Sequence, residues 1–135
     1  MSRDGKARFI SIPHYVYDSA SFAAITPNAE RLLIALIRQY DGFNNGDLTA
    51  IKSQLRFNPS RDTLKAALSS LIDQGLIVKV GEGSTSREGG KRPYLYALTW
   101  INVDEQRGKR RENKLGRIYQ GATKKPLRTK WPQAG

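Results

Sequence analysis

Two segments of the chain carry apolar residues at the spacing of an amphipathic α-helix, each between a capping hydroxyl and a glycine. Thr26 and Pro27 predict the start of the first helix and Gly42 its left-handed end, whereas Ser60 and Gly75 bound the second. The stripes follow the i, i+3, i+4, i+7, i+8 pattern at Ala29, Leu32, Leu33, Leu36 and Ile37, and at Leu64, Ala67, Leu68, Leu71 and Ile72. Because neither stripe can be buried alone, both helices must share one core.

Shorter elements are expected around these helices. Thr49 can cap a short helix with Ile51 and Leu55 on one side, ending at 58–59, and Leu48 is expected in a short strand. Residues 76–80 and 94–100 are β-branched or aromatic and predict two strands, joined by the polar loop 81–92. Residues 9–17 are expected to be extended, and Ser19 can cap a turn of helix through Phe22 and Ala23.

The order of elements, together with LSSLIDQGLI at 68–77, resembles the winged helix-turn-helix domain over residues 26–100. The expected fold class is α+β, with a three-helix core and a C-terminal β-hairpin. The predicted organisation is an N-terminal extension at 1–25, the winged domain at 26–105 and a basic arm at 106–135. Stretches such as IPHYVYDS and ATKKPLRTKW are also similar to small bacterial and mobile-element helix-turn-helix proteins of no known activity.

The resemblance implies a recognition helix at 60–74 and a wing at 81–92. A helix that reads duplex DNA needs polar side chains at the end that enters the major groove. Arg61 suits a guanine, because its guanidinium can donate to both O6 and N7. The candidate contacts on the helix are Ser60, Arg61, Asp62, Thr63, Lys65 and Ser69, and those on the turn and wing are Asn58, Arg87, Lys91 and Arg92. The alternatives are capping chemistry, a solvated helix start and a solvated hairpin loop.

Charge is concentrated at the C-terminal end of the chain. The formal net charge is +11, and residues 106–135 hold 10 basic residues against one acid, Glu112. The cations of this arm are expected to follow phosphates: Arg107, Lys109, Arg110, Arg111, Lys114, Arg117, Lys124, Lys125, Arg128 and Lys130. A solubilising tail is the alternative, although Tyr119 and Trp131 could dock on the domain or stack on a base.

Several classes of function are disfavoured by composition. The chain has no cysteine and one histidine, so disulfides, zinc fingers and a histidine-based triad are not expected. The glycine-rich loop lacks the Gly-Lys-Ser/Thr ending of a phosphate-binding loop. We therefore expect no enzyme, metal, cofactor or small-molecule ligand. No apolar run predicts a signal peptide or membrane span, so a cytoplasmic, nucleoid-associated protein is expected.

The leading hypothesis is sequence-specific binding of double-stranded DNA by a transcriptional regulator. Three alternatives stay open: a plasmid or phage replication protein, an RNA-binding protein, and a winged-helix module that binds another protein. Segment 9–25, which holds Phe9, Ile10, Tyr15, Val16 and Phe22, either packs on the domain or forms the interface of a homodimer.

Overall fold

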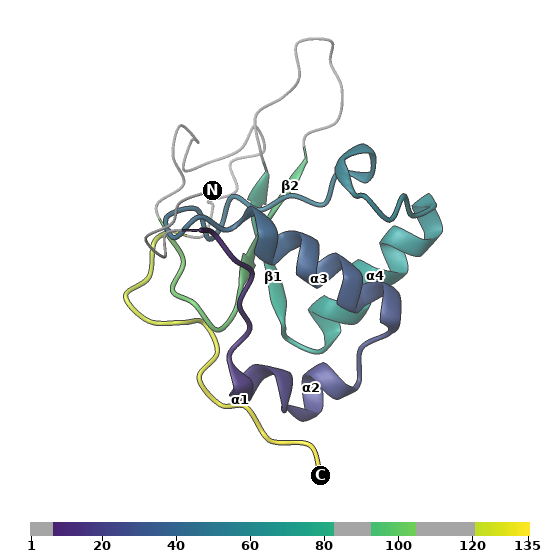
Figure 1. Cartoon of the computed structure of the whole chain (residues 1–135). Helices are drawn as coiled ribbons and strands as arrows, with labels where there is room; N and C mark the ends of the chain where they lie inside the picture. Colours follow the sequence, from purple (N-terminus) through teal and green to yellow (C-terminus); the bar gives the residue numbers. More distant parts are fainter. Residues whose placement is uncertain (1–6, 83–92, 105–120) are drawn as a thin grey trace.

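The chain has an α+β fold, described for residues 7–82, 93–104 and 121–135 of a computed structural model (Figure 1). Two long helices pack against each other and against a two-stranded antiparallel sheet. The elements of the described residues are α1 (His14–Tyr17), α2 (Ala20–Ala23), α3 (Pro27–Gln39), the 3-10 turn η1 (Lys52–Gln54), α4 (Arg61–Asp73), β1 (Ile77–Glu82) and β2 (Tyr94–Leu98).

Both long helices begin where their caps predict. The predicted end at Gly42 is wrong, because α3 ends at Gln39 and Tyr40 is already extended. The Thr26 hydroxyl accepts a hydrogen bond from the Ala29 amide at 3.1 Å and begins α3. The predicted stripe of α3 is buried throughout. On α4 only Ala67 and Leu71 are fully buried, while Ile72 is 41% exposed, so its buried face is narrower than the sequence predicted. Gly75 ends α4 with φ 72°, a left-handed conformation that disfavours residues with a Cβ.

The hairpin covers the open side of the two helices. Ile77 pairs with Leu98 and Glu82 with Tyr94, and a register shift lies between Lys79 and Gly81. The predicted short strand at Leu48 is a single bridge to Tyr96, with amide-to-carbonyl distances of 3.2 and 2.8 Å. This bridge ties the segment after α3 to the hairpin.

The N-terminal segment corrects one prediction. Residues 14–17 form a turn of helix rather than a continued strand, beginning after Pro13. The turn places Val16 in the main core, fully buried, while Tyr15 and Tyr17 stay about half exposed. The predicted cap at Ser19 is confirmed, since its hydroxyl accepts from the Phe22 amide. Packing of this segment on the domain is thus confirmed for Val16 and Phe22.

The helix expected to begin at Thr49 is also a correction, because only the 3-10 turn η1 forms there. The Gln39 side chain hydrogen-bonds to both backbone groups of Thr49. Its Nε2 donates to the Thr49 carbonyl at 2.7 Å, and its Oε1 accepts from the Thr49 amide at 2.9 Å. With Leu48 held in its bridge, residues 48–51 remain extended. The chain then makes the single turn η1 and is extended again at Leu55.

Asn45 is a buried polar residue that joins two loops. Its Nδ2 donates to the carbonyls of Leu98, Ile101 and Asn102 at 3.0 Å each, and its Oδ1 accepts from the Leu98 amide at 2.7 Å. The Asn45 amide also donates to the Asp104 carboxylate at 2.8 Å. The sequence indicated only a tight turn here, because these partners lie more than 50 residues away.

Candidate nucleic-acid interface

One face of α4 is polar and exposed. Arg61, Lys65 and Ser69 are exposed and lie four positions apart, so they share one face of the helix. Asp62 and Ala66 are exposed beside them. The opposite face packs against α3 through Ala67 and Leu71. The small residues Ala66 and Ser69, which follow Lys65, leave room for a close approach by a second molecule.

The first turn of α4 is organised by the chain that precedes it. The Ser60 hydroxyl accepts from the Thr63 amide at 3.1 Å and bonds to the Thr63 hydroxyl at 2.9 Å, which confirms the predicted cap. Asn58 is exposed with φ 47°, and its amide donates to the Leu55 carbonyl. Turn and cap chemistry therefore accounts for the backbone at 58–60. The exposed Asn58 side chain remains available to a ligand.

Three further exposed cations lie on the segments next to this turn: Lys52 on η1, Arg56 after η1 and Arg31 on α3. The Arg31 guanidinium carbon lies 5.8 Å from the centre of the Phe57 ring, which connects α3 to the turn. Sequence reasoning missed all three residues as part of the site. The signal was present for Lys52 and Arg56, which directly precede the predicted turn, whereas the position of Arg31 depends on the packing of α3.

The ends of β1 and β2 that lead into residues 83–92 lie in the upper half of Figure 1, as do η1 and the first turn of α4. Arg87, Lys91 and Arg92 lie outside the described residues. The described end of the hairpin and the first turn of α4 therefore lie toward the same end of the molecule.

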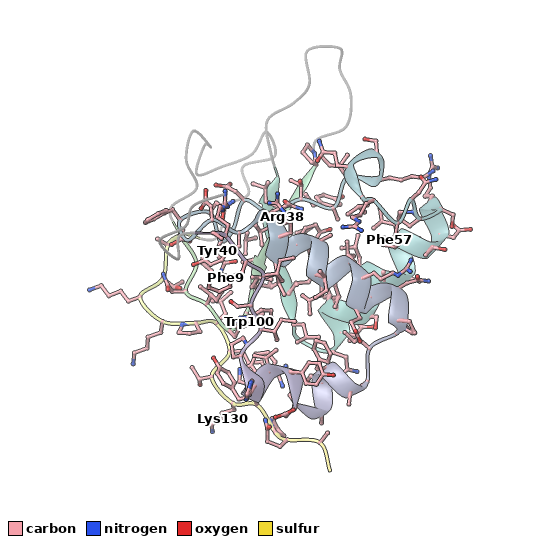
Figure 2. All side chains as sticks on the ribbon, in the orientation of Figure 1. Phe9, Arg38, Tyr40, Phe57, Trp100 and Lys130 are labelled. Carbon is pink, nitrogen blue, oxygen red and sulfur yellow. The ribbon has the colours of Figure 1, made fainter. Side chains whose placement is uncertain are left out.

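The described part of the basic arm lies elsewhere. Residues 121–135 pass over the lower left of the molecule, away from the first turn of α4, and Figure 2 places Lys130 there. Lys124, Lys125 and Lys130 are exposed. Tyr119 lies outside the described residues, as do six of the ten cations of the arm: Arg107, Lys109, Arg110, Arg111, Lys114 and Arg117.

Arg128 is engaged within the protein. Its guanidinium donates to the Gln74 carbonyl at 2.8 Å and the Ser21 hydroxyl at 2.9 Å, and its central carbon lies 3.9 Å from the centre of the Trp131 ring. Trp131 is 9% exposed and packs edge-on against Trp100 and Tyr15, with ring centres 6.2 and 6.3 Å away. Of the two open interpretations of Trp131, docking on the domain is confirmed.

Two tyrosines have altered acidity. Burial raises the pKa of Tyr96, and the Tyr94 side chain adds to that increase. Burial, followed by the charges of Asp104 and Asp41, raises the pKa of Tyr40. Both hydroxyls stay protonated at neutral pH and leave the positive charge of the chain unchanged.

Within the described parts of the chain, no three histidine, cysteine, aspartate or glutamate side chains group as metal ligands would. Among these same residues, every helix is too short or too polar to cross a bilayer.

Comparisons with known proteins returned nothing similar. No protein-family model matches the chain, and neither a curated protein nor a solved structure matches it.

Proposed function

We propose that the chain is a winged-helix protein that binds double-stranded DNA in a sequence-specific way and regulates transcription. The observation that carries this proposal is the exposed stripe of Arg61, Lys65 and Ser69 at the leading end of α4. Arg61 is the base-reading residue, because a guanidinium can donate twice to one guanine. Lys65, one turn further on, contacts a base or a phosphate.

The surroundings of α4 supply the phosphate contacts. Lys52 and Arg56 lie on the segment that precedes the recognition helix, where a helix-turn-helix crosses the DNA backbone. Arg87, Lys91 and Arg92 lie in the sequence between β1 and β2, and we expect them to contact the neighbouring groove. The excess of basic residues adds an attraction to polyanions that depends on salt but not on sequence.

Selection of bound duplexes from a random library tests the proposal directly. We expect one enriched motif, which binds at least about 1,000-fold more tightly than random duplex at the same salt. A palindromic motif would further indicate that two copies of the chain bind one site together. The absence of any enriched sequence would contradict sequence-specific reading.

Parallel titrations separate this function from its alternatives. The selected duplex, its single strands and the matching RNA duplex are compared at two salt concentrations. We expect the DNA duplex to bind most tightly and its affinity to fall steeply with salt, since several phosphates release counterions. Tighter binding of RNA or single strands would assign the chain to one of the alternative classes.

A further inference from the structure

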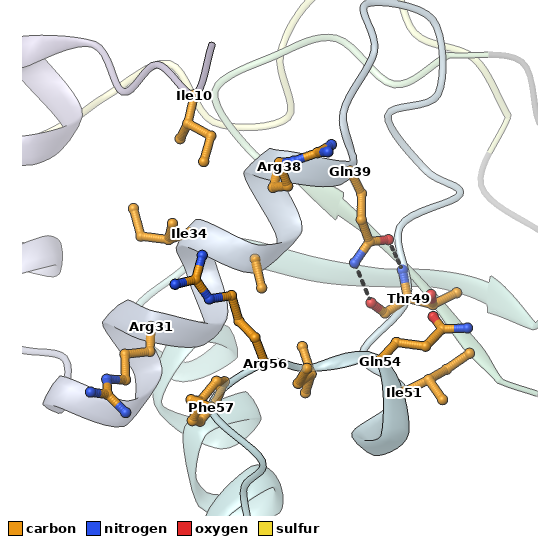
Figure 3. Close-up of a pocket in the computed structure, with 12 residues that line it drawn as sticks. Ile10, Arg31, Ile34, Arg38, Gln39, Thr49, Ile51, Gln54, Arg56 and Phe57 are labelled. Atoms are coloured by element: carbon orange, nitrogen blue, oxygen red, sulfur yellow. Dashed lines mark hydrogen bonds between the residues drawn. The ribbon is translucent and has the colours of Figure 1, made fainter. Parts of the chain in front are cut away.

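A pocket of about 740 Å³ lies between α3, residues 49–57 and Ile10 (Figure 3). Its size falls within the range of sites that hold small organic molecules, about 300–1,000 Å³. The predicted stripe of α3 faces the core, so the pocket uses another face of this helix, with Ile34 and Ala35. Both are only half-buried, although they are apolar.

The walls of the pocket are already formed. Leu55 is 5% exposed and closes it from the side of η1. The paired hydrogen bonds between the Gln39 amide and the Thr49 backbone hold the two sides together (Figure 3). A ligand would therefore meet an existing apolar surface and would not have to order the chain around itself.

Three arginines surround this apolar surface, and no acidic side chain is among the described residues that line it. Arg31 and Arg38 are seven positions apart on α3, which separates their backbones by about 10 Å. The Arg56 side chain extends from the opposite side toward Ile34 (Figure 3). Three cations beside an apolar surface complement one kind of ligand, an apolar body with an anionic group.

We propose that this pocket binds a small amphipathic organic anion. Its alkyl or aryl body packs on Ile34, Ala35 and Leu55, and its carboxylate or phosphate accepts hydrogen bonds from the arginines. Arg31 and Arg56 also flank the turn that leads into α4. A bound anion lowers the positive potential there and so weakens duplex binding, a consequence that rests on the proposed function.

Decanoate is the probe, used below the concentration at which it forms micelles, with decanol and decyltrimethylammonium as neutral and cationic controls of equal chain length. Calorimetry without DNA should show saturable binding of decanoate, with decanol at least about 10-fold weaker. Equal binding of all three, or of none, would overturn the proposal. If polyglutamate bound and decanoate did not, the pocket would be assigned to an acidic protein, and the proposal would again be overturned.

Isoleucine methyl signals locate the bound probe without any substitution. Decanoate should shift the methyl resonances of Ile10, Ile34 and Ile51, which line the pocket, and leave that of the buried Ile77 in place. Shifts confined to methyl groups elsewhere would contradict the site.

Two double variants test the anion contacts at equal change of charge. Arg31→Ala with Arg38→Ala should weaken decanoate about 10-fold or more, because hydrogen bonds between charged groups are lost. Lys124→Ala with Lys125→Ala, on the far segment, should leave the affinity unchanged. If both double variants weakened decanoate binding equally, the effect would come from the net charge of the protein alone, and the proposed site would be overturned.

The coupling to DNA is measured last, with the selected duplex and saturating decanoate. We expect about a 10-fold loss of duplex affinity, and an unchanged affinity would contradict the antagonism. If no duplex binds but decanoate does, the proposed function fails while the pocket assignment stands.

Discussion

The two ends of α4 are built in opposite ways. At its start, Ser60 caps the helix and the next two side chains are exposed. Within the described residues, neither the Arg61 side chain nor the Lys65 side chain has a hydrogen-bonding partner. At its end, the Thr99 hydroxyl donates to the Gly75 carbonyl at 2.7 Å, and Arg128 donates to the carbonyl of Gln74. The first turn is available to a ligand, and the C-terminal end is anchored to two distant parts of the chain.

This difference shows how the chain fixes the C-terminal end of α4. A guanidinium at a helix C-terminus satisfies carbonyls that the helix leaves free and interacts favourably with the helix dipole. Arg128 is itself held by Trp131 and by the Ser21 hydroxyl at the start of α2. The segment 121–135 thereby holds the C-terminal end of α4 in place and does not cover the first turn of that helix.

Among the substitutions near the C-terminal end of α4, removal of the Trp131 ring is expected to lower the free energy of unfolding most. Trp131→Ala should lower the free energy of unfolding by about 3–5 kcal/mol, because a buried indole and its contacts with Trp100 and Tyr15 are lost. Urea unfolding measures the change. Trp131→Phe, which keeps a ring, should lose clearly less, and a loss below about 1 kcal/mol for the alanine variant would contradict the anchoring role.

Removal of the Arg128 side chain should cause the second largest loss of stability. Arg128→Ala should cost about 1.5–3 kcal/mol, since hydrogen bonds from a charged group to Gln74 and Ser21 disappear. Thermal unfolding compares it with Lys130→Ala, which removes the same charge from an exposed position and should be nearly neutral. Equal stability of the two variants would show that the guanidinium does not support α4.

At the opposite end, Ser60→Ala removes only a cap. We expect a loss of about 1 kcal/mol, the usual value for a capping hydroxyl. Ser69→Ala, an exposed position inside the same helix, is the matched control and should be neutral or slightly stabilising. If Ser60→Ala were as harmful as Arg128→Ala, the first turn would be more tightly integrated than the comparison implies.

The smallest expected effect is a loss of stability at alkaline pH, caused by ionisation of Tyr96. Because folding raises the pKa of Tyr96, the folded state holds this proton more tightly than the unfolded chain. The contribution to stability is full below the ordinary tyrosine pKa of about 10 and is lost as the pH rises above it. Denaturant unfolding between pH 9 and 11 should show a shallower decline for Tyr96→Phe than for the exposed Tyr17→Phe, and identical slopes would contradict this.

The sequence predicted those parts of the fold that local chemistry determines. The caps at Thr26 and Ser60, the stripe of α3 and the end of α4 at Gly75 all depend on residues within a few positions of one another. The two strands were also found, to within a few residues.

Elements that depend on distant partners were missed. The helical turn at 14–17 forms because Val16 fills the core, and the helix expected after Thr49 fails because Gln39 holds the Thr49 backbone. The contacts of Arg128 likewise span more than 50 residues, so a pattern of charges along the chain could not separate this arginine from the other cations of the arm.

Binding of the selected duplex by Arg61→Ala, compared with Lys130→Ala, tests whether the first turn of α4 reads bases. We predict that Arg61→Ala weakens the selected duplex by about 1–3 kcal/mol and random duplex much less, with an unchanged free energy of unfolding. Lys130→Ala should affect both duplexes equally and slightly. If the two variants lost the same affinity on both duplexes, base reading by Arg61 would be contradicted.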